Sequence, residues 1–258
     1  MAAIIDLSGR VALVTGGTRG IGAGIARAFL RAGAQVAICA RRPPERPIEA
    51  AGRRARFHAV DLRAPDAAED LLTRVRVAHG RVDTLVNNAG GTPYRPLTRG
   101  GAARHEKVVR LNLLAPLAVS LAAHEVMRGQ GGGGSILMIG SVSGTRPSPG
   151  SAAYGAAKAG LAHLARSMAV EWAPSVRVNT LVVGMVRTER AAAHYGDEAG
   201  VAAVGRTVPL GRLAEPAEIG DACVFLASDR AAYISGASLH VHGGGERPAY
   251  LGALGADP

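Results

Sequence analysis

The sequence predicts an α/β fold, a doubly wound parallel sheet with helices on both faces. Short, uninterrupted apolar runs alternate with helical patterns along the 258 residues. Uninterrupted apolar runs are typical of strands covered on both faces, and alternating strands and helices imply a parallel sheet with right-handed crossovers. A glycine-rich turn also joins the first strand to the first helix. No repeat or linker divides the chain, so we expect one domain over residues 1–258.

Each element follows from its local pattern. The expected strands are 10–15, 35–40, 56–60, 83–88, 135–140, 176–183 and 237–242. The expected helices are 21–33, 66–79, 103–128, 151–173 and 215–227. After the second strand come Pro43, Pro44 and Pro47, and proline breaks a helix interior. We therefore expect a loop with at most one or two helical turns in this crossover.

Residues 184–214, rich in alanine and arginine, are predicted to form a lid. Small side chains leave room for a substrate there. His194 or Tyr195 is a candidate for substrate contact, although packing of a surface helix is the more common role of such residues.

Composition excludes several classes of function. The net charge of +10 comes from arginines spread over nearly the whole length, with no basic run interleaved with aromatics, so we expect no nucleic-acid partner. The charge does favour anionic substrates or partners. Cys39 and Cys223 are isolated, which predicts neither a disulfide framework nor a metal site. No uninterrupted apolar run approaches the roughly 20 residues of a membrane span, and we expect a soluble, cytoplasmic protein.

The stretch TGGTRGIG, residues 15–22, lies between a predicted strand and a predicted helix. Glycines allow a tight turn and close approach of the backbone to a pyrophosphate, and the helix N-terminus supplies unpaired N–H groups. A tight strand–helix turn without a ligand is the alternative. The context favours the dinucleotide site of a Rossmann fold. Its expected contacts are Gly16, Thr18, Arg19, Gly20, Ile21 and Gly22.

The end of the second strand predicts which dinucleotide binds. An acidic residue there would bind the ribose 2′-hydroxyl of NAD, but this chain has Ala40 followed by Arg41 and Arg42. Together with Arg19 these guanidinium groups suit a 2′-phosphate, so we expect NADP(H). Asp61 is a candidate for the adenine amino group or, equally, for the start of a helix. Further candidates at strand ends are Leu62, Asn88, Ala89 and Gly90.

Tyr154 and Lys158 are four residues apart on a predicted helix and so share a face. The chain has 30 lysines and arginines, and only Lys107 and Lys158 are lysines. A compact ammonium beside a phenol lowers the phenol pKa toward the working range. Ser141, at a strand end, suits donation to a substrate oxygen. Asn112, a polar residue in an apolar helix, suits either a water relay to Lys158 or a solvent-facing position.

Together, TGGTRGIG, NNAG, Asn112, Ser141 and Tyr-x-x-x-Lys resemble the short-chain dehydrogenase/reductase family in its compact single-domain form, over about residues 7–245. The resemblance implies that Tyr154 is the general acid/base and that Ser141 positions the substrate oxygen. It also implies that Lys158 binds the nicotinamide ribose and lowers the tyrosine pKa, while Asn112 supports a water relay.

The resemblance extends beyond the catalytic set, with two departures. Val186 and Thr188 match positions that hold the nicotinamide carboxamide in the family, and Gly184 is a further expected cofactor contact. The family's usual Pro-Gly before them reads Val183-Gly184 here, and its Asp-Gly-Gly near the C-terminus begins with His242. The first departure loosens the turn at the substrate lip, and the second puts local packing or a subunit contact in doubt.

The implied activity is NADP(H)-dependent hydride transfer between the nicotinamide and a carbonyl or secondary-alcohol substrate. The alternative is a 3-oxoacyl-thioester reductase, acting on an acyl carrier protein or CoA, which such members of the family resemble. A non-catalytic NADP-sensing regulator is less favoured, because such proteins typically lose the tyrosine found here as Tyr154. The resemblance also implies a homo-oligomer, a tetramer or dimer, through the helices near 103–128 and 151–173 and the C-terminal segment.

Overall fold

A seven-stranded sheet forms the centre of the computed structural model, which describes residues 5–189, 191 and 195–253. In spatial order its strands are β5 (Arg56–Ala59), β2 (Gln35–Ala40), β1 (Val11–Thr15), β6 (Thr84–Asn87), β7 (Gly134–Ile139), β8 (Val176–Val183) and β9 (Ser238–Val241). All neighbouring strands in this sheet are parallel. The strand order reverses direction between β1 and β6, which opens a crevice at their carboxyl ends. The predicted fold class is confirmed.

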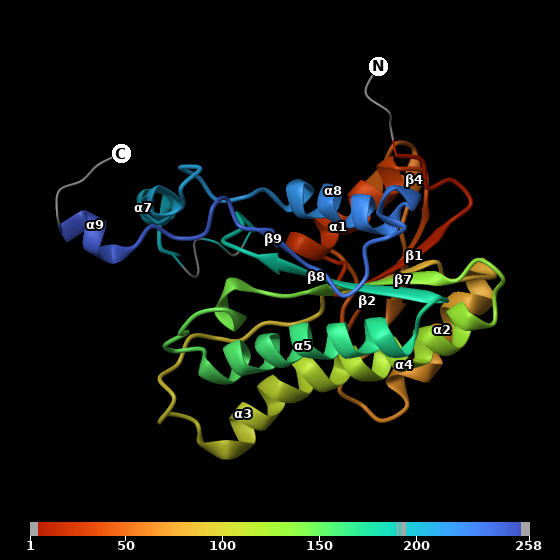
Figure 1. Ribbon diagram of the computed structural model, residues 1–258, viewed down its shortest axis with the longest axis horizontal. Helices are drawn as coiled ribbons and strands as arrows, with labels where there is room; N and C mark the ends of the chain where they lie inside the picture. The colour runs from red at the N-terminus through yellow and green to blue at the C-terminus, as the bar shows by residue number, and fades with distance from the viewer. Residues whose placement is uncertain (1–4, 190, 192–194, 254–258) are drawn as a thin grey trace.

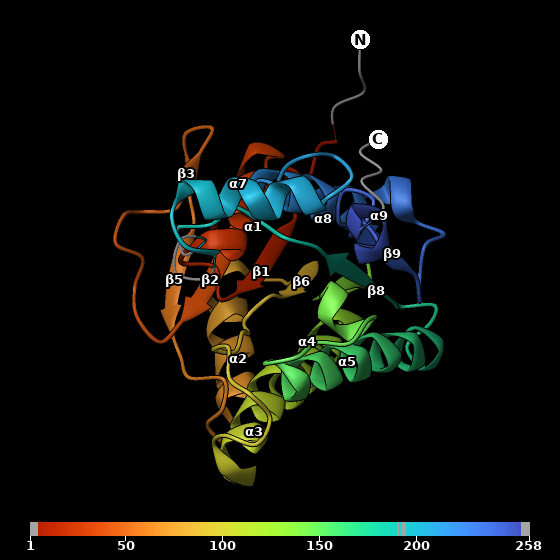
Figure 2. The ribbon, with the colours of Figure 1, turned by 90° about the vertical axis from the view of Figure 1, so that its left-hand side faces the viewer.

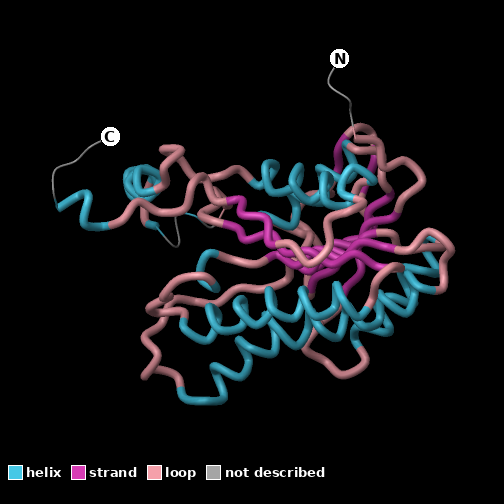
Figure 3. Tube along the Cα trace, viewed as in Figure 1, coloured by secondary structure: helices cyan, strands magenta, loops and turns pink. Residues whose placement is uncertain are grey.

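Helices cover both faces of the sheet. One layer holds α1 (Gly20–Arg31) and α8 (Pro216–Ala227), and the other holds α2 (Ala67–His79), α4 (Ala115–Arg128) and α5 (Ala152–Glu171) (Figures 1 and 2). Each layer encloses its own cluster of buried apolar side chains. Gly24 and Gly220 let α1 and α8 pack closely, because a Cβ on Gly220 would lie 2.6 Å from the Ala28 Cβ. The short helices α7 (Glu198–Thr207) and α9 (Ala249–Ala253) lie beyond the carboxyl ends of the strands (Figure 3).

The crossover after β2 differs from the expectation. It contains no full helix, as the prolines predict, and no helical turn, but the hairpin in it was not predicted. A small hairpin stands there instead, formed by β3 (Glu49–Ala50) and β4 (Arg53–Arg54), which are antiparallel. The turn between them places Ala51 and Gly52 at positive φ, 49° and 70°. Strands of two residues carry no apolar pattern, so the sequence does not reveal them.

The predicted helix 103–128 forms, but a π-helical turn interrupts its α-helical hydrogen-bonding pattern. It consists of α3 (Gly101–Val109), a π-helical turn (Arg110–Leu114) and α4 in one continuous helical path. By length and composition Gly101–Arg128 qualifies as a membrane span, the one such helix in the part of the chain that the structure describes. Core helices of globular proteins meet the same criterion, and α4 packs against α2, β6 and β7.

The region predicted as a lid is only partly described. Val186 forms an isolated parallel bridge with Ala214, which brings the two ends of the region together. Between them, Ala191, Val201 and Leu213 form a separate buried cluster. His194 lies outside the described residues.

Candidate active site

Thr15 joins the carboxyl ends of β1 and β6 at the central crevice. Its Oγ1 accepts hydrogen bonds from the backbone N–H groups of Asn88, at 3.0 Å, and Ala89, at 2.9 Å. In return, Asn88 Nδ2 donates to the Thr15 carbonyl at 2.8 Å. These bonds fix the segment after β6 against the glycine turn. The sequence analysis missed Thr15, whose signal is a polar side chain ending an otherwise apolar strand.

The glycine turn has the shape that a dinucleotide site requires. A Cβ on Gly16 would lie 3.0 Å from Asn88 Nδ2, and a Cβ on Gly22 would overlap the Gly16 carbonyl oxygen. Gly20 begins α1 with φ 52°, and its backbone N–H donates to a carboxylate oxygen of Glu189 at 3.1 Å. Positions 16 and 22 of the turn therefore require glycine, and the turn forms a cradle for a ligand. The N-terminus of α1 already binds an anionic group, the Glu189 carboxylate.

Arginines lie at the start of α1 and directly after β2. Arg19 immediately precedes α1, and Arg41 and Arg42 immediately follow β2; all three are exposed. Among the described residues, none of these guanidinium groups has an ion-pair or hydrogen-bond partner. Arg41 is close enough to Asp61 to contribute to lowering its carboxyl pKa. Arg41 and Arg42 thus follow the end of β2, where the described chain has no acidic residue.

Asp61 binds a neighbouring arginine. Its carboxylate accepts from Arg63 Nε at 2.9 Å and from Arg63 Nη2 at 2.5 Å. Mainly through these hydrogen bonds, Arg63 lowers the Asp61 pKa to about 2. Helix α2 begins later, after Asp66, so the alternative role of Asp61 as a helix-start residue is wrong. Leu62 packs on the edge of the buried cluster beneath.

Lys158 is buried beneath Tyr154 on α5. Its side chain donates to the Ile139 carbonyl at 2.7 Å, and its Nζ lies 5.5 Å from the centre of the Tyr154 ring. Burial lowers the Lys158 pKa to about 8. The lysine therefore remains protonated at neutral pH and places a positive charge near the phenol.

The Tyr154 pKa differs from the expectation. Burial raises it, a hydrogen bond with Ser141 opposes that rise, and Tyr195 adds to it. The predicted net lowering of the Tyr154 pKa by Lys158 is wrong for this structure, because burial raises that pKa. Ser141 Oγ accepts from the Ser143 backbone N–H at 3.1 Å, which leaves its hydroxyl hydrogen free to donate toward the phenol.

Asn112 is fully buried in the π-helical turn, so a solvent-facing position is wrong. Its Oδ1 accepts from the Gly91 N–H at 2.8 Å, while its Nδ2 donates to the carbonyls of Gly91, at 3.1 Å, and Val108, at 2.9 Å. A Cβ on Gly90 would lie 2.5 Å from Asn112 Oδ1 and 3.6 Å from Lys158 Nζ. Asn112 thus clamps the backbone after β6 beside Lys158.

The segment after β8 reaches back to the glycine turn. The Gly184 N–H donates to the Val241 carbonyl at 3.1 Å, and Val186 is buried. Thr188 lies against Gly20, with its Cγ2 3.4 Å from the position of a Cβ there. The Glu189 contact was not predicted, and no local sequence signal announces it.

The two departures from the family pattern have structural counterparts. Val183, in place of proline, pairs with Val241 as the last residue of β8. A Cβ on Gly184 would lie 2.8 Å from the Cα of His242. The His242 ring hydrogen-bonds the His240 ring, with 3.0 Å between Nε2 and Nδ1.

Comparison with known proteins agrees with this geometry. A family model described as enoyl-(acyl carrier protein) reductase matches residues 16–246. The 3-oxoacyl-[acyl-carrier-protein] reductase FabG of Vibrio cholerae is 38% identical over 245 residues, covering 93% of this chain and 98% of that protein. The cis-4-hydroxycyclohexanecarboxylate dehydrogenase of Sinomonas cyclohexanicum is 37% identical over 243 residues, covering 91% and 96%. The structure of the Pseudomonas aeruginosa RhlG/NADP active-site complex matches with TM-score 0.84 and 30% identity, covering 95% and 99%.

A Rossmann-type sheet with a glycine cradle beside a serine, a tyrosine and a buried lysine defines a nicotinamide-dependent oxidoreductase. The chain belongs to the short-chain dehydrogenase/reductase family. It is an oxidoreductase that acts on CH–OH or C=O groups.

Proposed function

We propose that this protein is an NADP(H)-dependent carbonyl reductase or alcohol dehydrogenase. The observation that carries the proposal is the Tyr154 phenol, hydrogen-bonded to Ser141 and lying over the buried Lys158 ammonium. When bound, the nicotinamide supplies or accepts the hydride. Ser141 holds the substrate oxygen, and Tyr154 delivers a proton to it in the reductive direction. The positive charge of Lys158 stabilises the phenolate that remains.

The cofactor fits the residues at the carboxyl edge of the sheet. The glycine cradle at residues 16–22 holds the pyrophosphate, and Gly184, Val186 and Thr188 hold the carboxamide end. Arg19 and Arg41 bind the 2′-phosphate that distinguishes NADP(H). The support for NADP(H) is the set of unpaired guanidinium groups and the absence of an acidic residue at the described end of β2.

Glu189→Gln should tighten NADPH binding by about two- to fivefold. The Glu189 carboxylate lies on the N–H group of Gly20, where the proposal places the pyrophosphate. The change removes a competing anion, and the gain is small because exposed charged contacts are weak. Fluorescence titration at low salt measures the affinity. Glu171→Gln, which removes one exposed charge at the far end of α5, is the matched control. Weaker binding by Glu189→Gln would show that this carboxylate supports the cofactor instead.

A 3-oxoacyl-thioester reductase is the second candidate, favoured by the similarity to FabG. One experiment tests both candidates: NADPH and NADH oxidation with a panel of ketones and 3-oxoacyl thioesters. We expect turnover with NADPH, at a catalytic efficiency at least about tenfold above that with NADH. Higher efficiency with thioesters than with free ketones selects the second candidate. Absence of binding of either cofactor would contradict the proposal.

The proposal includes a single-domain, cytoplasmic homo-oligomer. Leu114 and Leu121, seven residues apart along the helix, are 45% and 50% exposed, and Val170 on α5 is 80% exposed. Apolar side chains exposed along adjacent helices are typical of a surface that a second subunit covers. The mass in solution, from light scattering, tests the assembly.

A further inference from the structure

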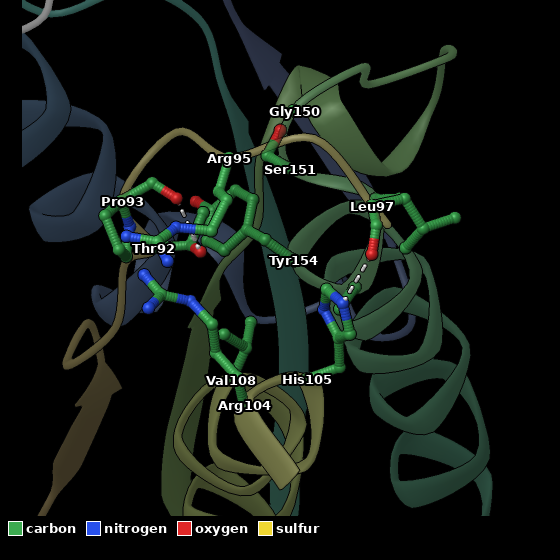
Figure 4. A pocket seen from close by; sticks show the side chains of 12 residues that line it. Thr92, Pro93, Arg95, Leu97, Arg104, His105, Val108, Gly150, Ser151 and Tyr154 are labelled. Atoms are coloured by element: carbon green, nitrogen blue, oxygen red, sulfur yellow. Dashed lines mark hydrogen bonds between the residues drawn. The ribbon is translucent and has the colours of Figure 1, made fainter. Parts of the chain in front are cut away.

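A small pocket opens beside Tyr154 on the substrate side of the site (Figure 4). Three segments form it: the loop after β6, one side of α3 (Gly101–Val109), and the start of α5. The residues that line it are Thr92, Pro93, Arg95, Leu97, Arg104, His105, Val108, Gly150, Ser151, Ala152, Ala153 and Tyr154. Because Tyr154 is among these residues, a group bound at the mouth of the pocket lies beside the tyrosine.

The main chain holds this loop in place on both sides of the pocket. The Arg95 N–H donates to the Gly150 carbonyl at 2.8 Å, and the Tyr94 ring covers Gly150, where it fills the place of a Cβ. On the other side, His105 Nε2 lies 3.0 Å from the Leu97 carbonyl oxygen. The backbone of Arg95 is therefore held in place by a hydrogen bond to Gly150.

Two guanidinium groups enter the pocket. Figure 4 shows Arg95 reaching in from the loop and Arg104 rising from α3, with their nitrogen-bearing ends on the same side of the pocket. Arg104 is half-buried, and its Cδ lies 2.6 Å from the position of a Cβ on Gly100. Arg95 is exposed.

The charge of this pocket is not balanced within the described part of the chain. No carboxylate is among the residues that line it. Neither Arg95 nor Arg104 has a hydrogen-bond or ion-pair partner among the described residues, whereas the nearby Arg146 is paired with Glu246. Two like charges on one side of a pocket repel each other, and an anion between them removes that cost while gaining two charge-assisted contacts.

We propose that Arg95 and Arg104 bind an anionic group of the substrate, so that the enzyme acts on carbonyl compounds carrying a carboxylate or phosphate away from the reacting carbon. The proposal rests on the reductase function proposed above, since it names the substrate class of that site. A guanidinium presents a planar fork of N–H donors that matches either anion. The anion held there leaves the rest of the substrate directed at Tyr154.

Matched probes test the charge without requiring turnover. Isothermal titration calorimetry compares cyclohexanecarboxylate with cyclohexanecarboxamide, and 4′-phosphopantetheine with pantetheine, on the protein alone and with NADPH. We expect the anionic member of at least one pair to bind at least about tenfold more tightly than its neutral partner. The pair with the larger difference identifies the source of the anion, a small oxo acid or the phosphate of a thioester carrier arm.

Single replacements then assign the preference to residues. Arg95→Gln and Arg104→Gln should each reduce the preference for the anion to about threefold or less. Arg99→Gln is the matched control, because Arg99 lies on the same loop, is exposed and does not line the pocket. Equal affinities within both pairs, or a preference that survives both replacements, would overturn the proposal.

Turnover of a neutral ketone separates this inference from the function on which it rests. Cyclohexanone has no anionic group, so its reduction by NADPH is measured on the unaltered protein and on Arg99→Gln, whose rates should agree within about threefold. If cyclohexanone is reduced but the probe pairs bind equally, the anion site is wrong and the reductase function stands. If no ketone or thioester is reduced, the reductase function fails, and the calorimetry still decides whether the pocket binds anions.

Discussion

Replacement of Tyr154 by phenylalanine should lower kcat for carbonyl reduction by about 10³-fold or more, while NADPH affinity stays within about twofold. The change removes the one hydroxyl that delivers the proton and leaves the ring in place. Ser141 keeps its bond to the Ser143 N–H, so the strand end is not disturbed. Steady-state rates with NADPH and fluorescence titration give the two quantities.

Tyr233→Phe is the matched control for this variant. Tyr233 is fully exposed at the protein surface, and its hydroxyl takes no part in the site. We expect it to match the parent protein in both rate and affinity. Turnover by Tyr154→Phe at more than about a tenth of the parent rate would falsify the assignment of Tyr154 as proton donor.

Lys158→Met should make the cofactor-free protein more stable and nearly inactive. Burial lowers the Lys158 pKa to about 8, so the folded protein holds an ammonium at neutral pH in surroundings that disfavour the charge. Methionine has a similar length and carries no charge. After the loss of the hydrogen bond to Ile139 is subtracted, we expect a gain of about 2 kcal/mol in the free energy of unfolding at pH 7.

The direction of the Lys158 pKa shift determines how this difference in stability changes with pH. The folded pKa of Lys158 lies below the unfolded value, so its destabilising effect is fully present below pH 8. As the pH rises from about 8 to 10.5, the folded protein loses the proton first and the penalty disappears. The stability advantage of Lys158→Met should therefore shrink across that range.

Urea denaturation at pH 7 and pH 9.5, without cofactor, measures the two free energies. Activity should fall by at least about 10²-fold, because the phenolate loses the ammonium that stabilises it. Lys107→Met is the control, since the other lysine of the chain is exposed on α3 and neither quantity should change. A Lys158→Met protein that is less stable at pH 7 would mean that the ammonium stabilises the fold through its bond to Ile139.

The sequence predicts the central elements well because burial on both faces leaves a continuous apolar pattern. The strands 35–40 and 176–183 have in the structure the bounds that the sequence predicts. The hairpin at 49–54 and the π-helical turn at 110–114 are absent from the prediction. The hairpin has strands of only two residues, and the π-helical turn is a short irregularity within a longer helix, so neither leaves a periodic apolar pattern in the sequence.

The residues of the candidate site were likewise predicted only in part. Four-residue spacing places Tyr154 beside Lys158, but spacing carries no information on burial, and burial raises the Tyr154 pKa instead of leaving the lysine to lower it. Glu189 meets Gly20 across 169 residues of sequence, so no local pattern predicts the contact. Arg95 and Arg104 are two among many arginines, and only the folded loop brings their side chains into one pocket.

The π-helical turn makes the substrate side of the site sensitive to helix length. A helical residue advances by about 100° around the axis, so deleting one residue from Arg110–Leu114 would rotate Asn112 away from Gly91 or turn the apolar face of α4 off the sheet. The extra residue of the π-helical turn lets Asn112 face Gly91 while the apolar face of α4 still faces the sheet. Relatives of this protein are therefore expected to vary in length at the glycine-rich stretch 129–133, and to keep the number of residues between Asn112 and α4 constant.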